Sequence, residues 1–198
     1  MIKGIILDVD GVIVGEKIGF NSPDPHPDII QALKVVREKG IFISLCTAKP
    51  HFSIRSIIQS AKLDNYHITD GGGVIINPVQ NEIVKKFTID SNNAKEVIDF
   101  YIKNNIYTEY YTVDDYVIQQ NQTSKITEQH KHILQQDAKV VDNLGRVSLK
   151  EEITKIMPVA LDEKDKERVT ELFEPFKDKL TLSWGVHPVA LPLQFGRV

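Results

Sequence analysis

The sequence predicts an α/β protein built on a parallel sheet, with a second α/β unit inserted into it. The apolar run at residues 5–7 shows no alternation with polar residues and ends in two acids, as expected for a strand buried on both faces of a parallel sheet. Near residue 88 the pattern changes, and a second series of helical and β-like segments begins. A chain of 198 residues has room for two small domains of this kind.

The first half of the chain predicts a βαβ unit. A helix is expected to begin at Pro27, because proline suits the first helical turn, and to end at Gly40. A second buried strand follows at residues 41–45, and the right-handed crossover between the two parallel strands places their carboxyl ends side by side. The remaining expected elements are a helix at 51–63, a third strand at 66–69 and a hairpin at 74–87.

The second half predicts a separate α/β unit at residues 88–187. Apolar residues recur at helical spacing from Ala94 to Ile102, and short β-like runs with aromatic residues follow. The other elements expected here are strands at 106–111, 115–118, 155–161 and 179–184, a polar helix at 123–135, an apolar piece at 140–141 and a charged helix at 162–176.

Composition excludes several classes of protein. Hydrophobic residues make up 41% and charged residues 26% of the chain, which is ordinary for a soluble globular protein. The net charge of −3 gives no reason to expect nucleic acid or a membrane as a partner. The single cysteine, Cys46, lies in an apolar run and is interpreted as a small core residue, so a reducing, cytoplasmic location is expected.

The candidate catalytic residues follow the first strand. Asp8 could act as a carboxylate nucleophile towards phosphorus, and Asp10, on the same side of an extended chain, could act as general acid and base. Two adjacent carboxylates also suit Mg²⁺, so Asp8 and Asp10 are the candidate metal ligands. Gly11 lets the backbone turn sharply and lets a ligand approach closely.

A hydroxyl follows the second strand. Thr47 lies beside Asp8 in the predicted sheet, where it could donate to a phosphate oxygen or cap the next helix, and the two roles are compatible. Asp70 precedes three glycines and is interpreted as a turn residue. Its strand lies two positions from the first, roughly 10 Å away, which is too far to share an ion with Asp8.

These segments resemble motifs of the haloacid dehalogenase (HAD) superfamily, in particular its Cof-like phosphatases. Residues 8–12, Asp-Val-Asp-Gly-Val, resemble the first motif, Asp-x-Asp-Gly-Thr or Asp-x-Asp-Gly-Val. Residues 47–50, Thr-Ala-Lys-Pro, resemble the second, Thr-Gly-Arg-Pro, with Lys49 in the place of its arginine. Lysine keeps the charge but lacks the planar fork of arginine.

The resemblance implies a HAD-like Rossmannoid core, formed by residues 1–87 and 188–198, and an α/β cap domain at 88–187. It implies Mg²⁺-dependent hydrolysis of a small phosphorylated metabolite through an aspartyl-phosphate on Asp8. Asp10 would be the acid and base, its backbone carbonyl would join Asp8 on the metal, and Thr47, Gly11 and Lys49 would surround the phosphoryl group.

The resemblance also implies that part of the core is missing. A lysine of the third motif and the acids of the fourth motif have no counterpart in these 198 residues. The missing strand would leave residues 5–7 as an apolar edge. We therefore expect a fragment or frame-shifted product of a longer protein, or an edge that is covered by local rearrangement or by another chain, as in a homo-oligomer.

Two other functions stay open at this point. Phosphomannomutases share the cap type and the first motif, so transfer of phosphate within a sugar is one alternative. The absent motifs suit a different class, a catalytically inactive protein that binds a ligand or partner through its cap.

Overall fold

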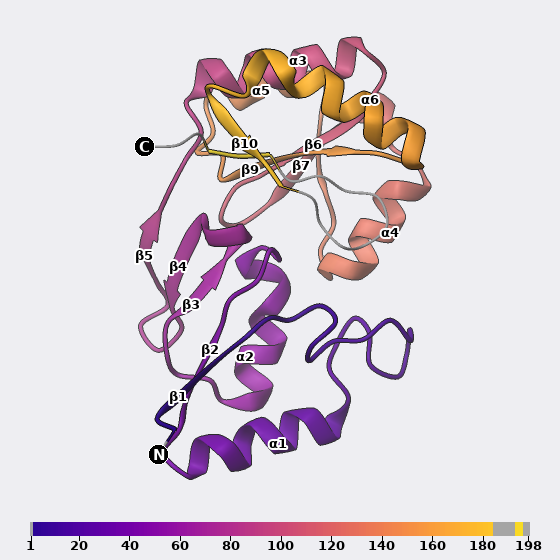
Figure 1. The fold of residues 1–198 in the computed structure, drawn as a ribbon. Helices are drawn as coiled ribbons and strands as arrows, with labels where there is room; N and C mark the ends of the chain where they lie inside the picture. The colour runs from indigo at the N-terminus through magenta and orange to yellow at the C-terminus, as the bar shows by residue number, and fades with distance from the viewer. Residues whose placement is uncertain (1, 184–192, 196–198) are drawn as a thin grey trace. The chain divides into compact units, whose positions relative to one another are not determined.

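The computed structural model describes residues 2–183 and 193–195, which belong to two compact units (Figure 1). The first unit holds the chain up to Lys86 together with Glu128–Asp137. The second holds Phe87–Thr127 together with the chain from Ala138 onward. The change of unit after Lys86 lies next to the change of sequence pattern, whereas Glu128–Asp137, expected in the inserted unit, is grouped with the first.

The first unit begins with the βαβ arrangement that the sequence predicts. Strands β1 (Gly4–Leu7) and β2 (Phe42–Leu45) pair in parallel, and helix α1 (Pro27–Glu38) connects them. The helix starts where the His26 side chain accepts a hydrogen bond from the backbone of the first turn. It ends before Gly40, whose φ of +76° reverses the chain into β2.

The sheet of the first unit continues beyond β2. Strand β3 (His67–Thr69) is joined to β2 by a parallel bridge between Cys46 and Ile68. Strands β4 (Val74–Asn77) and β5 (Glu82–Lys86) then follow β3 in an antiparallel arrangement. The predicted hairpin is therefore confirmed.

The helix expected at residues 51–63 forms in two parts. A 3-10 turn, η1 (His51–Ile54), continues into α2 (Arg55–Ala61), which ends at Lys62 in a left-handed conformation with φ of +53°. A second 3-10 turn, η2 (Asp70–Gly72), follows β3.

Two burial predictions for the first unit are wrong. Strand β1 was expected to be buried on both faces of the sheet, but Ile6 is 69% exposed, and Phe42 on the same face of β2 is 63% exposed. The exposure of Ile6 agrees with the other expectation, an apolar edge at residues 5–7. Within the described residues β1 pairs with β2 alone, so one edge and one face remain open, while Ile43 and Leu45 on the opposite face are buried. Cys46, expected in the core, is exposed at the end of β2.

The second unit is a mostly antiparallel sheet of six described strands, in the order β10-β11-β9-β6-β7-β8. Its strands are β6 (Tyr107–Tyr111), β7 (Tyr116–Gln119), β8 (Lys139–Val141), β9 (Lys155–Val159), β10 (Leu180–Leu182) and β11 (Leu193–Phe195). The helices of this unit are α3 (Ser91–Lys103), α5 (Leu144–Ser148) and α6 (Glu163–Phe173), with 3-10 turns η3 (Gln120–Gln122) and η4 (Glu174–Phe176). Helix α4 (Lys125–Leu134) lies between β7 and β8 in the chain, but most of it is grouped with the first unit. Figure 1 shows α3, α5 and α6 on one face of this sheet. None of the helices in the described residues is long and apolar enough to cross a membrane.

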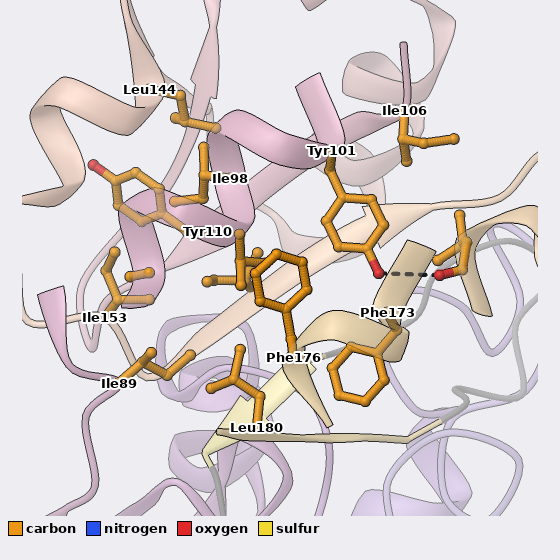
Figure 2. Packing of buried hydrophobic residues seen from close by; sticks show 14 of the residues in the cluster. Ile89, Ile98, Tyr101, Ile106, Tyr110, Leu144, Ile153, Phe173, Phe176 and Leu180 are labelled. Atoms are coloured by element: carbon orange, nitrogen blue, oxygen red, sulfur yellow. Dashed lines mark hydrogen bonds between the residues drawn. The ribbon is translucent and has the colours of Figure 1, made fainter. Parts of the chain in front are cut away.

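The core of the second unit lies between that sheet face and the three helices (Figure 2). Ile98 and Tyr101 from α3 and Tyr110 from β6 are fully buried in it, and Phe173 and Phe176 belong to the same cluster. The Tyr101 hydroxyl donates to the backbone carbonyl of Val169 in α6 at 3.1 Å (Figure 2). This cluster gives the second unit a hydrophobic core of its own.

Two elements of the second unit differ from the expectation. Helix α5 was not predicted, because five residues are too few to show helical periodicity; Asn143 caps its first turn. Residues 188–198 were assigned to the core. The described part of that segment, strand β11, instead pairs with β10 and β9 in the sheet of the second unit.

Candidate active site

Asp8 and Asp10 follow the carboxyl end of β1, and the buried residue Val9 lies between them in the chain. Val9 is fully buried, which turns both neighbouring side chains towards solvent. One Asp8 carboxylate oxygen accepts a hydrogen bond from the Val9 amide at 2.7 Å. The Asp10 side chain is 51% exposed. The arrangement leaves both carboxylates accessible to a ligand.

The loop after these acids folds back on itself. The Val14 amide donates to the Val9 carbonyl at 2.8 Å, and the Gly11 amide donates to the Val14 carbonyl at 2.8 Å. Gly11 has φ of +75°, a conformation that a side chain would strain. Because its amide is engaged within the loop, Gly11 serves the turn directly, and its predicted phosphate contact stays a prediction.

Thr47 lies at the same end of the sheet as Asp8. The Cys46 amide donates to the Leu7 carbonyl at 2.8 Å, which places the residues after β2 beside those after β1. Thr47 is 4% exposed, and its hydroxyl oxygen accepts from the Lys49 amide at 3.2 Å. That bond uses the oxygen as an acceptor, so the hydroxyl hydrogen can still be donated to a ligand.

Lys49 points towards the first acidic motif. Its ammonium lies 3.5 Å from an Asp10 carboxylate oxygen, and its side chain is only 6% exposed. The same nitrogen donates to the Ile133 backbone carbonyl at 3.4 Å. The structure thus brings Asp10, Lys49 and Thr47 into one region of the first unit.

The turn after β3 holds the loop that carries Thr47 and Lys49 through backbone hydrogen bonds. Asp70 is fully buried with φ of +54°, and its amide donates to the Lys49 carbonyl at 2.9 Å. The Gly71 amide donates to the Thr47 carbonyl at 3.0 Å. The interpretation of Asp70 as a turn residue is confirmed, and its backbone also fixes the loop that carries Thr47 and Lys49.

The donors at the end of β1 fit a hard divalent cation. Carboxylate and carbonyl oxygens are the ligands that Mg²⁺ prefers, and it commonly takes one or two carboxylates and keeps several waters. Asp8 and Asp10 are both exposed at this point. No group of three or more histidines, cysteines or acids with metal-site geometry occurs within the described ranges.

Sequence reasoning missed two contributors to the site. Asp70 was interpreted only as a turn residue, and the backbone of the Asp70–Gly72 turn was not expected to support Thr47 and Lys49. The Ile133 carbonyl lies 84 positions from Lys49 in the chain, and a backbone carbonyl carries no sequence signal. Only the folded arrangement could identify either group.

Fold and site together define a Rossmann-like α/β protein with an acidic site at the carboxyl ends of its parallel strands. The chain belongs to the haloacid dehalogenase-like hydrolase family, whose model matches residues 5–190. It is also similar to a curated phosphatase of Bacillus subtilis strain 168, the 5-amino-6-(5-phospho-D-ribitylamino)uracil phosphatase YwtE, with 25% identity over 116 residues. That match covers 59% of this chain and 37% of the relative, so it spans well under half of the relative's length.

Solved structures share the fold. A haloacid dehalogenase-like hydrolase from Bacteroides thetaiotaomicron has a TM-score of 0.82 at 18% identity, over 98% of this chain and 71% of that one. A hydrolase of the HAD/COF-like type from Plasmodium vivax has a TM-score of 0.81 at 20% identity, over 99% of this chain and 69% of that one. The family model confirms the predicted family, and the solved structures confirm the α/β fold class.

Proposed function

We propose that this chain carries the nucleophile and the acid–base residue of a Mg²⁺-dependent phosphomonoester hydrolase. The observation that carries the proposal is the exposed pair Asp8 and Asp10 at the end of β1, with Thr47 and Lys49 beside it. The membership of the hydrolase family and the phosphatase among its curated relatives support the same reaction.

In the first step, an Asp8 carboxylate oxygen attacks the phosphorus atom, and the bond from phosphorus to the ester oxygen breaks. Asp10 gives its proton to the departing oxygen, so the alcohol leaves neutral and Asp8 carries the phosphoryl group. In the second step, Asp10 takes a proton from water while the water oxygen attacks phosphorus. The bond between phosphorus and the Asp8 oxygen breaks, and inorganic phosphate leaves. Asp8 is then a free carboxylate again, and Asp10 again carries the proton that it gives in the first step.

The remaining groups bind and orient the phosphoryl oxygens. The Thr47 hydroxyl donates a hydrogen bond to one of them, and the exposed loop at Gly11 leaves room for the others. Phosphatases of this family generally use a divalent metal ion. We propose Mg²⁺, held by the Asp8 carboxylate and the Asp10 backbone carbonyl, where its charge would offset that of the phosphoryl oxygens.

We propose a small phosphorylated metabolite as substrate and the cytoplasm as location. The curated relative is named for a small phosphorylated ribityl compound, which supports a substrate of this size. A single cysteine, without a partner for a disulfide, supports a reducing compartment.

The test is phosphate release from an aryl phosphate with Mg²⁺. Asp8→Asn should lower turnover by roughly 1,000-fold or more, because the nucleophile is lost. Asp10→Asn should lower it by roughly 100-fold or more, because proton transfer is lost. Removal of Mg²⁺ with EDTA should abolish release, and added Mg²⁺ should restore it.

The matched control is Asp178→Asn, which removes an exposed carboxylate in the second unit and should leave turnover unchanged. Equal release by wild type and Asp8→Asn would refute the proposal. Ligand binding without turnover, unaffected by Asp8→Asn, would favour an inactive binding protein instead.

A further inference from the structure

Lys49 is a buried lysine whose charge is directed at Asp10. Its side chain is 6% exposed, whereas that of Asp10 is 51% exposed, and the two charged atoms lie 3.5 Å apart. Lysine is seldom buried to this extent unless its charge is paired. The Asp10 carboxylate supplies the pairing that a lysine buried to this extent requires.

The second contact of the ammonium is the end of helix α4. Ile133 lies in the last turn of that helix (Lys125–Leu134), where backbone carbonyls lack partners within the helix. Its carbonyl accepts from the Lys49 ammonium at 3.4 Å. A cation at this end of a helix is stabilised by the helix dipole. Both residues belong to the first unit.

The backbone of Lys49 is fixed as well. Its carbonyl accepts from the Asp70 amide at 2.9 Å, and its amide donates to the Thr47 hydroxyl oxygen at 3.2 Å. Side chain and main chain are thus both held before any ligand binds. An ammonium group has three N–H donors. The Lys49 ammonium already has two acceptors within reach, the Asp10 carboxylate and the Ile133 carbonyl.

We propose that Lys49 is a positioning residue for Asp10, not a ligand of the phosphoryl group, and that the end of α4 holds its ammonium in place. The proposal rests on the proposed function in one respect, the role of Asp10 as acid and base. It assigns a part in the site to residues 128–137, which lie far from both acidic residues in the chain.

The kinetic test compares Lys49→Met, Lys49→Gln and Lys49→Arg with wild type. The two uncharged variants should lower kcat about 10-fold or more, because Asp10 is no longer oriented, while inhibition by inorganic phosphate changes less than about twofold. Lys49→Arg should restore most of kcat, because it keeps a cation near Asp10. A large rise in KM and in the inhibition constant for phosphate, with kcat preserved, would overturn the proposal.

A second measurement does not need turnover. Hydrogen exchange followed by mass spectrometry should show faster exchange in residues 8–15 and 128–137 of Lys49→Met than of wild type. The control, Lys39→Met, removes an exposed lysine after α1 and should leave both segments unchanged. Unchanged exchange in Lys49→Met would overturn the proposed contacts of Lys49.

The two proposals fail in different ways. If wild type and Asp8→Asn are equally inactive, the phosphatase proposal fails, but phosphate binding followed by calorimetry still tests Lys49. Binding that is unchanged in Lys49→Met, together with faster exchange, would support the contacts to Asp10 and α4. Binding that is strongly weakened would identify Lys49 as a phosphate ligand.

Discussion

Two tyrosines in the core of the second unit differ in what their hydroxyl groups contact. Both are fully buried, but the Tyr101 hydroxyl donates to the Val169 carbonyl, whereas the Tyr110 hydroxyl has no hydrogen-bond partner among the described residues. Tyr101→Phe should therefore lower the free energy of unfolding by about 1 kcal/mol. Tyr110→Phe should leave it unchanged or raise it by up to about 1 kcal/mol, because an unpaired buried hydroxyl is removed.

Denaturant unfolding of the two variants measures this difference directly. Each variant is the control for the other, because both remove one buried hydroxyl from the same cluster. An equal loss of stability in both would contradict the assignment of the Tyr110 hydroxyl as unpaired.

A third residue, His67 at the start of β3, links stability to pH. Burial lowers the pKa of its imidazole from 6.5 to about 4, and the nearby His51 charge acts in the same direction. Its Nδ1 accepts from the Leu45 amide at 3.0 Å, which requires the neutral ring. Between pH 4 and pH 6.5 the unfolded chain binds more protons at His67 than the folded one, so stability rises with pH across this window.

The expected size of this effect is about 2 kcal/mol between pH 5 and pH 7. It is measured as the difference in pH dependence of unfolding between wild type and His67→Gln, since the other histidines contribute equally to both. If the two proteins lose the same stability on acidification, His67 does not carry the effect.

At the scale of elements, strands β1 and β2 expose large apolar side chains. Ile6 and Phe42 lie on the same face of the β1–β2 pair and are 69% and 63% exposed. An open apolar edge strand favours association with another chain. We therefore expect the protein to self-associate through this face, and Ile6→Lys to shift it towards monomer in sedimentation experiments.

The matched control is Leu161→Lys in the second unit. Leu161 is 63% exposed but follows β9 outside the open edge, so its substitution should leave the association state unchanged. A monomeric wild type, or equal effects of both substitutions, would rule out association through β1.

At the scale of the whole molecule, the residues proposed for the reaction are confined to one of the two units. All the residues proposed for chemistry lie in the first unit, at loops that follow β1 and β2. The second unit has its own sheet and core and carries none of them. Loops at strand ends can change chemistry without disturbing a packed core, which is why short motifs identified the family while identity to its solved relatives is low.

The sequence by itself determined what depends on neighbouring residues in the chain. The end of β1 at Asp8, the start of α1 at Pro27 and the hairpin of β4 and β5 were all predicted, because periodicity and turn residues act locally. The two motifs that identify the family, residues 8–12 and 47–50, are likewise short runs of neighbouring residues.

Only the tertiary structure decided burial and distant contacts. The fold exposes Cys46, groups Glu128–Asp137 with the first unit and directs Lys49 towards Asp10 and Ile133. These features depend on which segments lie beside one another in space. A residue's own pattern cannot encode a partner that is a backbone carbonyl from a distant helix, so sequence reasoning could not reach the contacts of Lys49. The apolar edge at residues 5–7, in contrast, was expected from the sequence.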